Sequence, residues 1–319
     1  YLDLPVIAGT INRYIHLKAT PNNEGIYNVY LPDIEENRVI HLNNKTTQIE
    51  RDDYFLSGIK VLEQKGAHFA QGYNITISGN IPVNAGLSSS SALVVAWIRF
   101  LIQAQKDPIQ YSDLEVGQLT YTSEVLFFDQ PGGLMYQYTI APGGLLYIDT
   151  NTTDCTALPG KLGPLVVAES GIAKQTLTIL KKGRIYGQEA IKAINNKYPD
   201  FNIQSIHVDD YERYKNDVPK DYLPYWYAAV HNYDITLKAK KVLESKGSTE
   251  ELGFLMNSHQ KILEEYILNT PKPMMKMMQN ARENGAMGTK IIGSGGGGSM
   301  VAMVNEESKE NVINAFLAS

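Results

Sequence analysis

The spacing of apolar residues divides the chain into a strand-rich first part and a helix-rich second part. Near the start, short runs of β-branched and aromatic residues are separated by turns that contain Asn, Asp and Gly, which is typical of strands. Strands are therefore predicted over residues 6–8, 14–17, 27–30, 38–42 and the alternating stretch 72–78. Asp52 and Asp53 open a predicted helix that extends to about Lys65 and ends at Gly66.

The pattern then changes from strand to buried helix across a loop of glycine and serine. Residues 81–91 form this loop, and the apolar stretch 92–104 predicts the helix. A second helix, a Gly-rich loop and a strand are predicted over 112–127, 131–133 and 144–149. Residues 151–160 are rich in Thr, Asp, Pro and Gly, so they predict a connector.

Helical periodicity dominates after this connector. A strand is predicted over 165–169, followed by helices over about 173–195, 222–245, 249–268 and 272–284. The polar stretch 197–221 is predicted to be a surface excursion. Strands over 289–292 and 299–304 enclose a run of glycines, and a helix over 306–317 follows them. The chain is therefore predicted to be an α+β protein, and 319 residues allow roughly two domains.

Charge and composition narrow the function classes. The chain has 29 Lys+Arg against 34 Asp+Glu, a net charge of −5, and no basic stripe, so no nucleic-acid partner is expected. No apolar run approaches the roughly 18 residues that span a membrane. The single cysteine, Cys155, cannot form an internal disulfide, which together with the lack of a visible leader predicts a cytoplasmic protein. The chain opens on Tyr1 without an initiator Met, so we expect the natural protein to begin earlier.

The strongest signal for a ligand site is the segment 82–92. Gly86 lets the backbone approach a ligand closely, and the four serines 88–91 lead into a helix whose first N–H groups and dipole suit phosphate oxygens. A hydroxyl at this position also suits a Mg²⁺ ion that bridges two phosphates. The alternatives are a linker or an ordinary serine cap. A Walker A loop is excluded because its Gly-Lys-[Ser/Thr] ending is absent.

Two further segments add to this hypothesis. Residues 293–298 include five glycines. This predicts close approach to a ligand or to the loop over residues 81–91, here called the serine loop, with a loose turn as the alternative. Glu124 stands at the end of a predicted helix, before the Gly-rich turn at Gly132 and Gly133. Such a turn would let Glu124 hold the metal and direct position 136 toward the same site. Taken alone, Glu124 would be a solvated helix residue.

Together these segments resemble the motifs of the GHMP kinases, the family of galactokinase, homoserine kinase, mevalonate kinase and phosphomevalonate kinase. The family's Pro-x-x-x-Gly-Leu-Ser-Ser-Ser-Ala loop is similar to residues 82–92, and its C-terminal Gly-rich turn is similar to residues 290–299. Ser258-His259 and residues 132–137 resemble galactokinase-like sugar kinases, whereas the four glycines 295–298 resemble mevalonate kinases. The similarity covers nearly the whole chain.

The resemblance implies an N-terminal domain over 1–156, similar to domain 2 of ribosomal protein S5, and a ferredoxin-like C-terminal domain over 157–319. Such enzymes transfer the γ-phosphoryl group of ATP, with Mg²⁺, to a hydroxyl of a small molecule. By position, Ser90 would be the hydroxyl on Mg²⁺, with Ser89 as its nearest rival, and Glu124 would be the acidic ligand. The implied nucleotide-binding residues are Pro82, Asn84, Ala85, Gly86, Leu87, Ser88, Ser89, Ser90, Ser91, Gly295, Gly296 and Gly297, and the implied substrate residues are Gly132, Gly133 and Tyr136.

The chain departs from the family pattern at two places. Tyr136 stands where these kinases have the aspartate proposed as catalytic base, and the family's first motif would end at about Tyr1. Tyrosine, with a reference pKa of about 10, is neutral near pH 7 and bulkier than aspartate. We therefore predict weak or no sugar-kinase turnover, with ATP binding retained.

Three functions remain open from the sequence. The first is a kinase for the anomeric hydroxyl of galactose or a related sugar. The second is a mevalonate kinase, and the third is a protein that binds ATP and sugar without catalysis, which Tyr136 favours. His231 is predicted to pack along a helix, and Trp226 is predicted to lie in the core or in a subunit contact. His259 is predicted either to contact the substrate or to form a hydrogen bond between helices.

Overall fold

The computed structural model describes residues 2–42, 48–82, 85–173 and 176–319, so of the predicted site residues only Asn84 lies outside the described part. The chain divides into two compact units. Unit 1 comprises Tyr1–Ile7, Asn84–Leu87 and Leu145–Ser319, and unit 2 comprises Ala8–Val83 and Ser88–Gly144. The domain boundary after residue 156, which the resemblance implies, stays a prediction.

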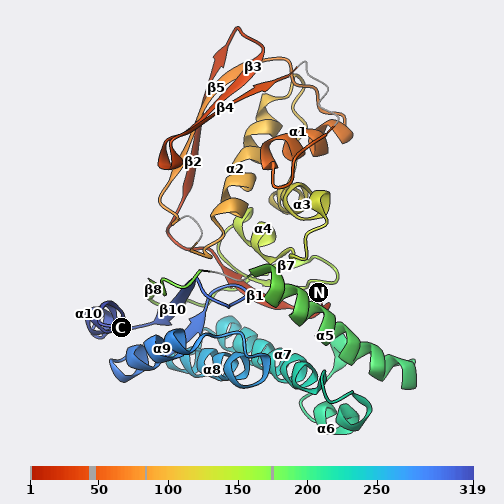
Figure 1. Cartoon of the computed structure of the whole chain (residues 1–319), viewed down its shortest axis with the longest axis vertical. Coiled ribbons are helices and arrows are strands. Elements are labelled where there is room, and N and C mark those ends of the chain that lie inside the picture. The colour runs from red at the N-terminus through yellow and green to blue at the C-terminus, as the bar shows by residue number, and fades with distance from the viewer. Residues whose placement is uncertain (1, 43–47, 83–84, 174–175) are drawn as a thin grey trace. The chain divides into compact units, whose positions relative to one another are not determined.

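Unit 2 is built on a four-stranded sheet with helices along one side (Figure 1). The strand order is β2-β5-β3-β4; β3 and β5 are parallel, and the other pairs are antiparallel. Alternate residues such as Val29, Ile75 and Ile77 face the core, as the period of two predicts. The strands are β2 Ile15–Asn22, β3 Ile26–Leu31, β4 Glu36–His41 and β5 Gly72–Gly79.

Helices α1 (Tyr54–Gln64) and α2 (Ser89–Ala104) bury their apolar sides against this sheet. Trp97 of α2 is fully buried, packs edge-on against Phe55 at 4.9 Å, and donates its indole N–H to the Phe55 carbonyl at 3.0 Å. Gly58 of α1 leaves room for this indole, because a Cβ there would come within 2.9 Å of Trp97. The apolar helix predicted over 92–104 is thus confirmed as the centre of the unit 2 core.

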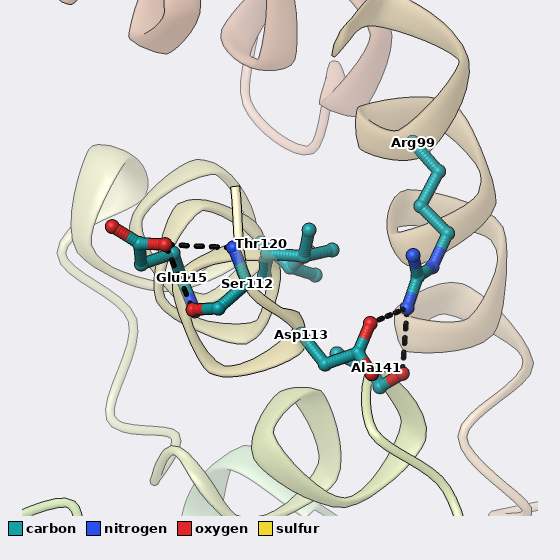
Figure 2. Close-up of polar contacts among 7 residues, drawn as sticks. Arg99, Ser112, Asp113, Glu115, Thr120 and Ala141 are labelled. Carbon is teal, nitrogen blue, oxygen red and sulfur yellow. Dashed lines mark hydrogen bonds and ion pairs between the residues drawn. The ribbon is translucent and has the colours of Figure 1, made fainter. Parts of the chain in front are cut away.

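Helix α3 (Asp113–Glu124) begins at a capping box in which Ser112 and Glu115 bond each other's backbone N–H groups (Figure 2). Arg99 of α2 pairs with Asp113 at 2.6 Å and donates to the Ala141 carbonyl at 2.8 Å, which ties three helices together (Figure 2). The third helix, α4 (Met135–Ile140), was not predicted. Its six residues are mostly β-branched or aromatic, so local propensity did not indicate a helix there.

Unit 1 contains an antiparallel sheet of β8 (Leu165–Glu169), β10 (Ser299–Met303) and β9 (Gly288–Ile291), in that order. Three helices pack against these strands: α8 Thr249–Ile262, α9 Lys272–Glu283 and α10 Lys309–Leu317. A second sheet has the order β1-β6-β7. Its strands are β1 Val6–Gly9, β6 Leu145–Ile148 and β7 Cys155–Ala157. Strand β7 lies in the stretch predicted to be a connector, so that prediction was incomplete.

Strand β9 lies at the edge of its sheet. Side chains of α8 form hydrogen bonds with this edge, where no further strand pairs in the described residues. Asn257 accepts from Thr289 N at 2.9 Å and donates to the Met287 carbonyl at 2.9 Å, and Gln260 accepts from Ile291 N at 2.9 Å. Gly253 permits this approach, since a Cβ there would meet the Met287 backbone at 2.7 Å. The edge is therefore satisfied by one helix face.

The remaining helices of unit 1 are α5 Thr176–Lys197, α6 Asp210–Tyr214 and α7 Leu223–Glu244. The prediction that residues 197–221 are a surface excursion was wrong, because Ile206, Tyr214 and Val218 are buried and join Trp226 in one apolar cluster. Their irregular spacing among polar residues hid them from a periodicity argument. Trp226, predicted to lie in the core or in a subunit contact, lies in the core. No helix in the described ranges is long and apolar enough to cross a membrane.

Candidate active site

The start of α2 is unusual because its cap residue does not cap it. Ser88 has a left-handed backbone (φ 60°), and its side chain makes no hydrogen bond to the helix N–H groups. Its hydroxyl bonds to Tyr136 instead. Gly86, two residues earlier, also has positive φ (83°). The first N–H groups of α2 are therefore left without a side-chain acceptor in the described residues, an arrangement that favours an anion.

A buried carboxylate lies beside this helix start. Glu124, the last residue of α3, is 6% exposed. Ser91 donates to its Oε1 at 3.0 Å, and Gln137 of α4 donates to its Oε2 at 2.6 Å. Among the residues that the structure describes, no Lys, Arg or His forms an ion pair with Glu124. A buried charge without a counter-ion is costly, so a bound cation fits this position.

The hydroxyl that contacts Glu124 belongs to Ser91, which is 2% exposed, whereas Ser90 is exposed. Ser89 is half-buried. The assignment of Ser90 to Mg²⁺, with Ser89 as its rival, stays a prediction, and the geometry adds Ser91 as a third candidate. Gln137 was not predicted from the sequence to donate a hydrogen bond to Glu124, although it lies in the segment 132–137 that resembles galactokinases. Its Oε1 is buried without a partner in the described residues.

Tyr136 is half-buried next to these groups. Burial raises the pKa of its phenol, the nearby Glu124 raises it further, and the hydrogen bond from Ser88 partly opposes them. The phenol is therefore neutral at physiological pH, in agreement with the prediction that it is a poor base. Gly132 and Gly133 precede it, and a Cβ on Gly133 would meet nothing within 4 Å.

The C-terminal Gly-rich turn, residues 293–298, belongs to unit 1. It lies against other backbone segments of the same unit. Gly295 and Gly297 have φ of 80° and 127°. A Cβ on Gly295 would come within 2.5 Å of the Asn269 carbonyl, and one on Gly297 within 2.7 Å of the Ala173 carbonyl. Only glycine fits such contacts. The turn is thus closely packed, not loose.

The turn ends at Ser299, whose Oγ donates to the carbonyl of Ala85 at 2.5 Å. Ala85 belongs to the serine loop, so the predicted approach of the glycine run to that loop is confirmed. Nucleotide contacts of Gly295, Gly296 and Gly297 stay predictions.

Two basic groups of unit 1, Lys290 of β9 and His259 of α8, lie close enough to interact electrostatically. Lys290 of β9 donates to the Ile291 carbonyl at 3.2 Å, and burial lowers the pKa of its ammonium to about 8. Burial and, secondarily, Lys290 lower the pKa of His259 to about 3, so its imidazole is neutral. His231 packs on the ring of Tyr227 at 4.0 Å, which agrees with its predicted structural role.

Comparison with known proteins finds similarity to galactokinases and mevalonate kinases. The chain is 27% identical over 304 residues to galactokinase of Limosilactobacillus reuteri, covering 90% of this chain and 76% of that protein. It is 26% identical over 319 residues to mevalonate kinase of Thermococcus onnurineus, covering 96% and 84% respectively. The crystal structure of Lactococcus lactis galactokinase in complex with galactose matches the fold with a TM-score of 0.87 at 18% identity, over 99% of this chain and 85% of that one.

Family models locate this similarity along the chain. The model for the N-terminal domain of GHMP kinases matches residues 53–144, which contain the serine loop, Glu124 and Tyr136. The model for the C-terminal domain of GHMP kinases matches residues 239–319, which contain the Gly-rich turn. The chain therefore belongs to the GHMP kinases and has their two-domain α+β fold.

Proposed function

We propose that the protein transfers the γ-phosphoryl group of ATP to a sugar, at the anomeric hydroxyl of galactose or a related sugar, with turnover lowered by Tyr136. The observation that carries this proposal is the buried, uncompensated Glu124 beside the uncapped start of α2. An anion-binding helix end and a cation-binding carboxylate are what a metal–phosphate complex requires.

The donor set fits Mg²⁺. In the described residues no group of three or more His, Cys, Asp or Glu side chains could hold a metal by itself. Mg²⁺ commonly takes one or two protein oxygens and completes its shell with phosphates and water. Glu124 would hold it together with the hydroxyl of Ser90, of its rival Ser89, or of Ser91. When bound, the ion neutralises charge on the transferred phosphoryl group.

The chain's own residues then bind and orient the nucleotide. The N–H groups at the start of α2 would receive phosphate oxygens, with Gly86 allowing the backbone to approach them. Nucleotide binding by Gly295, Gly296 and Gly297 is part of the same proposal. Gln137 and Ser91 orient the Glu124 carboxylate, because each donates to one of its oxygens.

Tyr136 accounts for the low turnover that we expect. Its neutral phenol cannot accept the proton of a sugar hydroxyl, and Glu124 is already bonded by two donors. Positioning and charge neutralisation remain, and they supply most of the acceleration in phosphoryl transfer. A positioned carboxylate base contributes about 10²–10⁴-fold more.

Galactokinase similarity and the Ser258-His259 helix support a sugar as acceptor. The mevalonate kinase relatives and the run of four glycines support the alternative, a mevalonate kinase. A protein that binds ATP and sugar without catalysis is the remaining alternative, and Tyr136 favours it. For all three we expect a small-molecule partner and a cytoplasmic site of action.

The test combines calorimetry with ADP release. ATP with Mg²⁺ should bind, and ADP release with galactose, galacturonate and mevalonate should identify the acceptor. Tyr136→Asp should raise turnover with the preferred sugar by about 10²-fold or more. Ligand binding with no ADP release in either form would favour the binding protein, and preference for mevalonate would favour the mevalonate kinase.

A further inference from the structure

The contact between Ser299 and Ala85 joins positions 214 residues apart in the sequence. Ser299 is fully buried, and Ala85 is 5% exposed. The acceptor is a main-chain carbonyl one residue before Gly86, where the backbone turns with positive φ. A buried hydroxyl bonded to a buried carbonyl fixes the acceptor's backbone, because breaking the bond leaves a polar group unsatisfied.

The turn that precedes Ser299 is itself fixed by hydrogen bonds to neighbouring segments. Ser170 donates both its N–H, at 3.0 Å, and its Oγ, at 2.6 Å, to the Gly298 carbonyl, and Gly298 N donates to Ile172 O at 2.9 Å. On the other side, Gly296 N donates to Asn269 O at 2.7 Å, and Asn269 Nδ2 donates to Ser294 O at 3.0 Å. Ser299 therefore projects from a turn with hydrogen bonds on two sides.

We infer that Ser299 is a positioning residue: its hydroxyl holds the Ala85 carbonyl so that the backbone from Gly86 to Ser88 keeps the shape that receives the nucleotide. The inference rests on the proposed nucleotide-binding role of this loop. It gives the Gly-rich turn a function of its own, since the five glycines let the turn pack closely enough for Ser299 to reach Ala85.

The test uses Ser299→Ala and Ser299→Cys, whose thiol is larger and a weaker donor. Hydrogen exchange of the Gly86, Leu87 and Ser88 amides is measured without nucleotide, and ATP·Mg²⁺ affinity is measured by calorimetry. Ser299→Ala should accelerate exchange at these amides and weaken ATP affinity about tenfold, with Ser299→Cys intermediate. Galactose affinity should change less than ATP affinity.

Thr120→Val is the matched control. Thr120 lies in α3 (Figure 2) and is also fully buried. Its hydroxyl donates to the Val116 carbonyl at 2.8 Å. This variant should leave loop exchange and ATP affinity unchanged, even where its melting temperature falls as much as that of Ser299→Ala.

Three results would overturn the inference. If the unmodified protein binds ATP and Ser299→Ala binds it equally, with unchanged exchange, the positioning role is wrong and the proposed function stands. If Thr120→Val weakens ATP binding to the same degree, the effect is general destabilisation. If the unmodified protein binds no nucleotide, the proposed function fails, and the inference fails with it.

Discussion

At the scale of single residues, Glu124 lowers the stability of the metal-free fold and is proposed to bind the metal. Its carboxylate is buried without a cation in the described part of the chain, so the metal-free fold bears an uncompensated charge. Glu124→Gln removes that charge, and its Oε1 can still accept from Ser91. The Gln137 amide, which now donates to Oε2, has to turn so that its own Oε1, unpartnered in the described residues, accepts from the new amide nitrogen. We expect the variant to be more stable than the parent without metal, by roughly 1 kcal/mol, and to lose Mg²⁺-dependent ATP affinity.

Thermal melting with and without Mg²⁺·ATP checks this prediction. Ser123→Ala, next to Glu124, removes a buried hydroxyl without a charge change and serves as control. If Glu124→Gln keeps the full nucleotide-induced shift in melting temperature, Glu124 does not hold the metal.

His259 predicts a pH dependence of stability. Its pKa is about 3 in the folded chain against a reference of 6.5, chiefly because burial disfavours the imidazolium. Between these values the unfolded state binds the extra proton, so the free energy of unfolding falls as pH decreases from about 6.5 toward 3. Above that range the histidine contributes no pH dependence.

Denaturant titrations at intervals between pH 4 and pH 8 measure this effect. His259→Gln, which cannot be protonated there, should lose less stability on acidification than the parent chain. His231→Gln is the comparison, since burial also lowers the pKa of His231 while Asp234 opposes that shift. Equal acid sensitivity of the parent and His259→Gln would contradict the assignment.

At the scale of elements, side chains of α8 bond to the edge of β9 where a further strand would otherwise pair. Gln260 is 1% exposed, and its Oε1 accepts from Ile291 N at 2.9 Å. Gln260→Leu should destabilise unit 1 by about 1–3 kcal/mol, because a buried N–H is left without an acceptor. Gln260→Glu retains an acceptor for Ile291 N but places a buried carboxylate against Glu264, to which Gln260 Nε2 donates at 2.9 Å, so it should destabilise unit 1 at least as much as Gln260→Leu. Urea denaturation of both variants distinguishes these effects.

Elements with strong periodicity were predictable from the sequence, and elements that depend on tertiary contacts were not. The helix over 92–104, the strand over 165–169 and the Gly-rich turn all occur, because each has a local pattern. Helix α4 and strand β7 are short, and their stability depends on packing and strand pairing that local sequence does not encode.

The candidate site shows the same limit. Glu124 was singled out as a carboxylate at a helix end before a Gly-rich turn, and the family resemblance implied its role as metal ligand. Its partners Ser91 and Gln137 were not identified as such. Ser299 was missed altogether, since a bond that spans 214 residues leaves no local signal. Motifs indicate which residues touch the ligand, whereas the residues that hold them in place emerge only from the folded structure.

At the scale of the whole molecule, each unit has its own apolar core and one buried tryptophan. Trp97 lies in the core of unit 2, and Trp226 in a core cluster of unit 1; both are 0% exposed. The chain contains only these two tryptophans. Single-tryptophan variants, Trp226→Phe and Trp97→Phe, therefore report on unit 2 and unit 1 respectively.

Separate cores predict that a cavity in one unit destabilises that unit first. Leu62 of α1 is 0% exposed in the unit 2 core, so Leu62→Ala should cost about 2–5 kcal/mol there. In the Trp226→Phe background, where Trp97 is the reporter, the urea midpoint should fall. In the Trp97→Phe background the Trp226 midpoint should stay within error, because the cavity lies outside the cluster that surrounds Trp226. If both midpoints fall equally, the chain unfolds as one cooperative body, and the two cores do not act as independent units of stability.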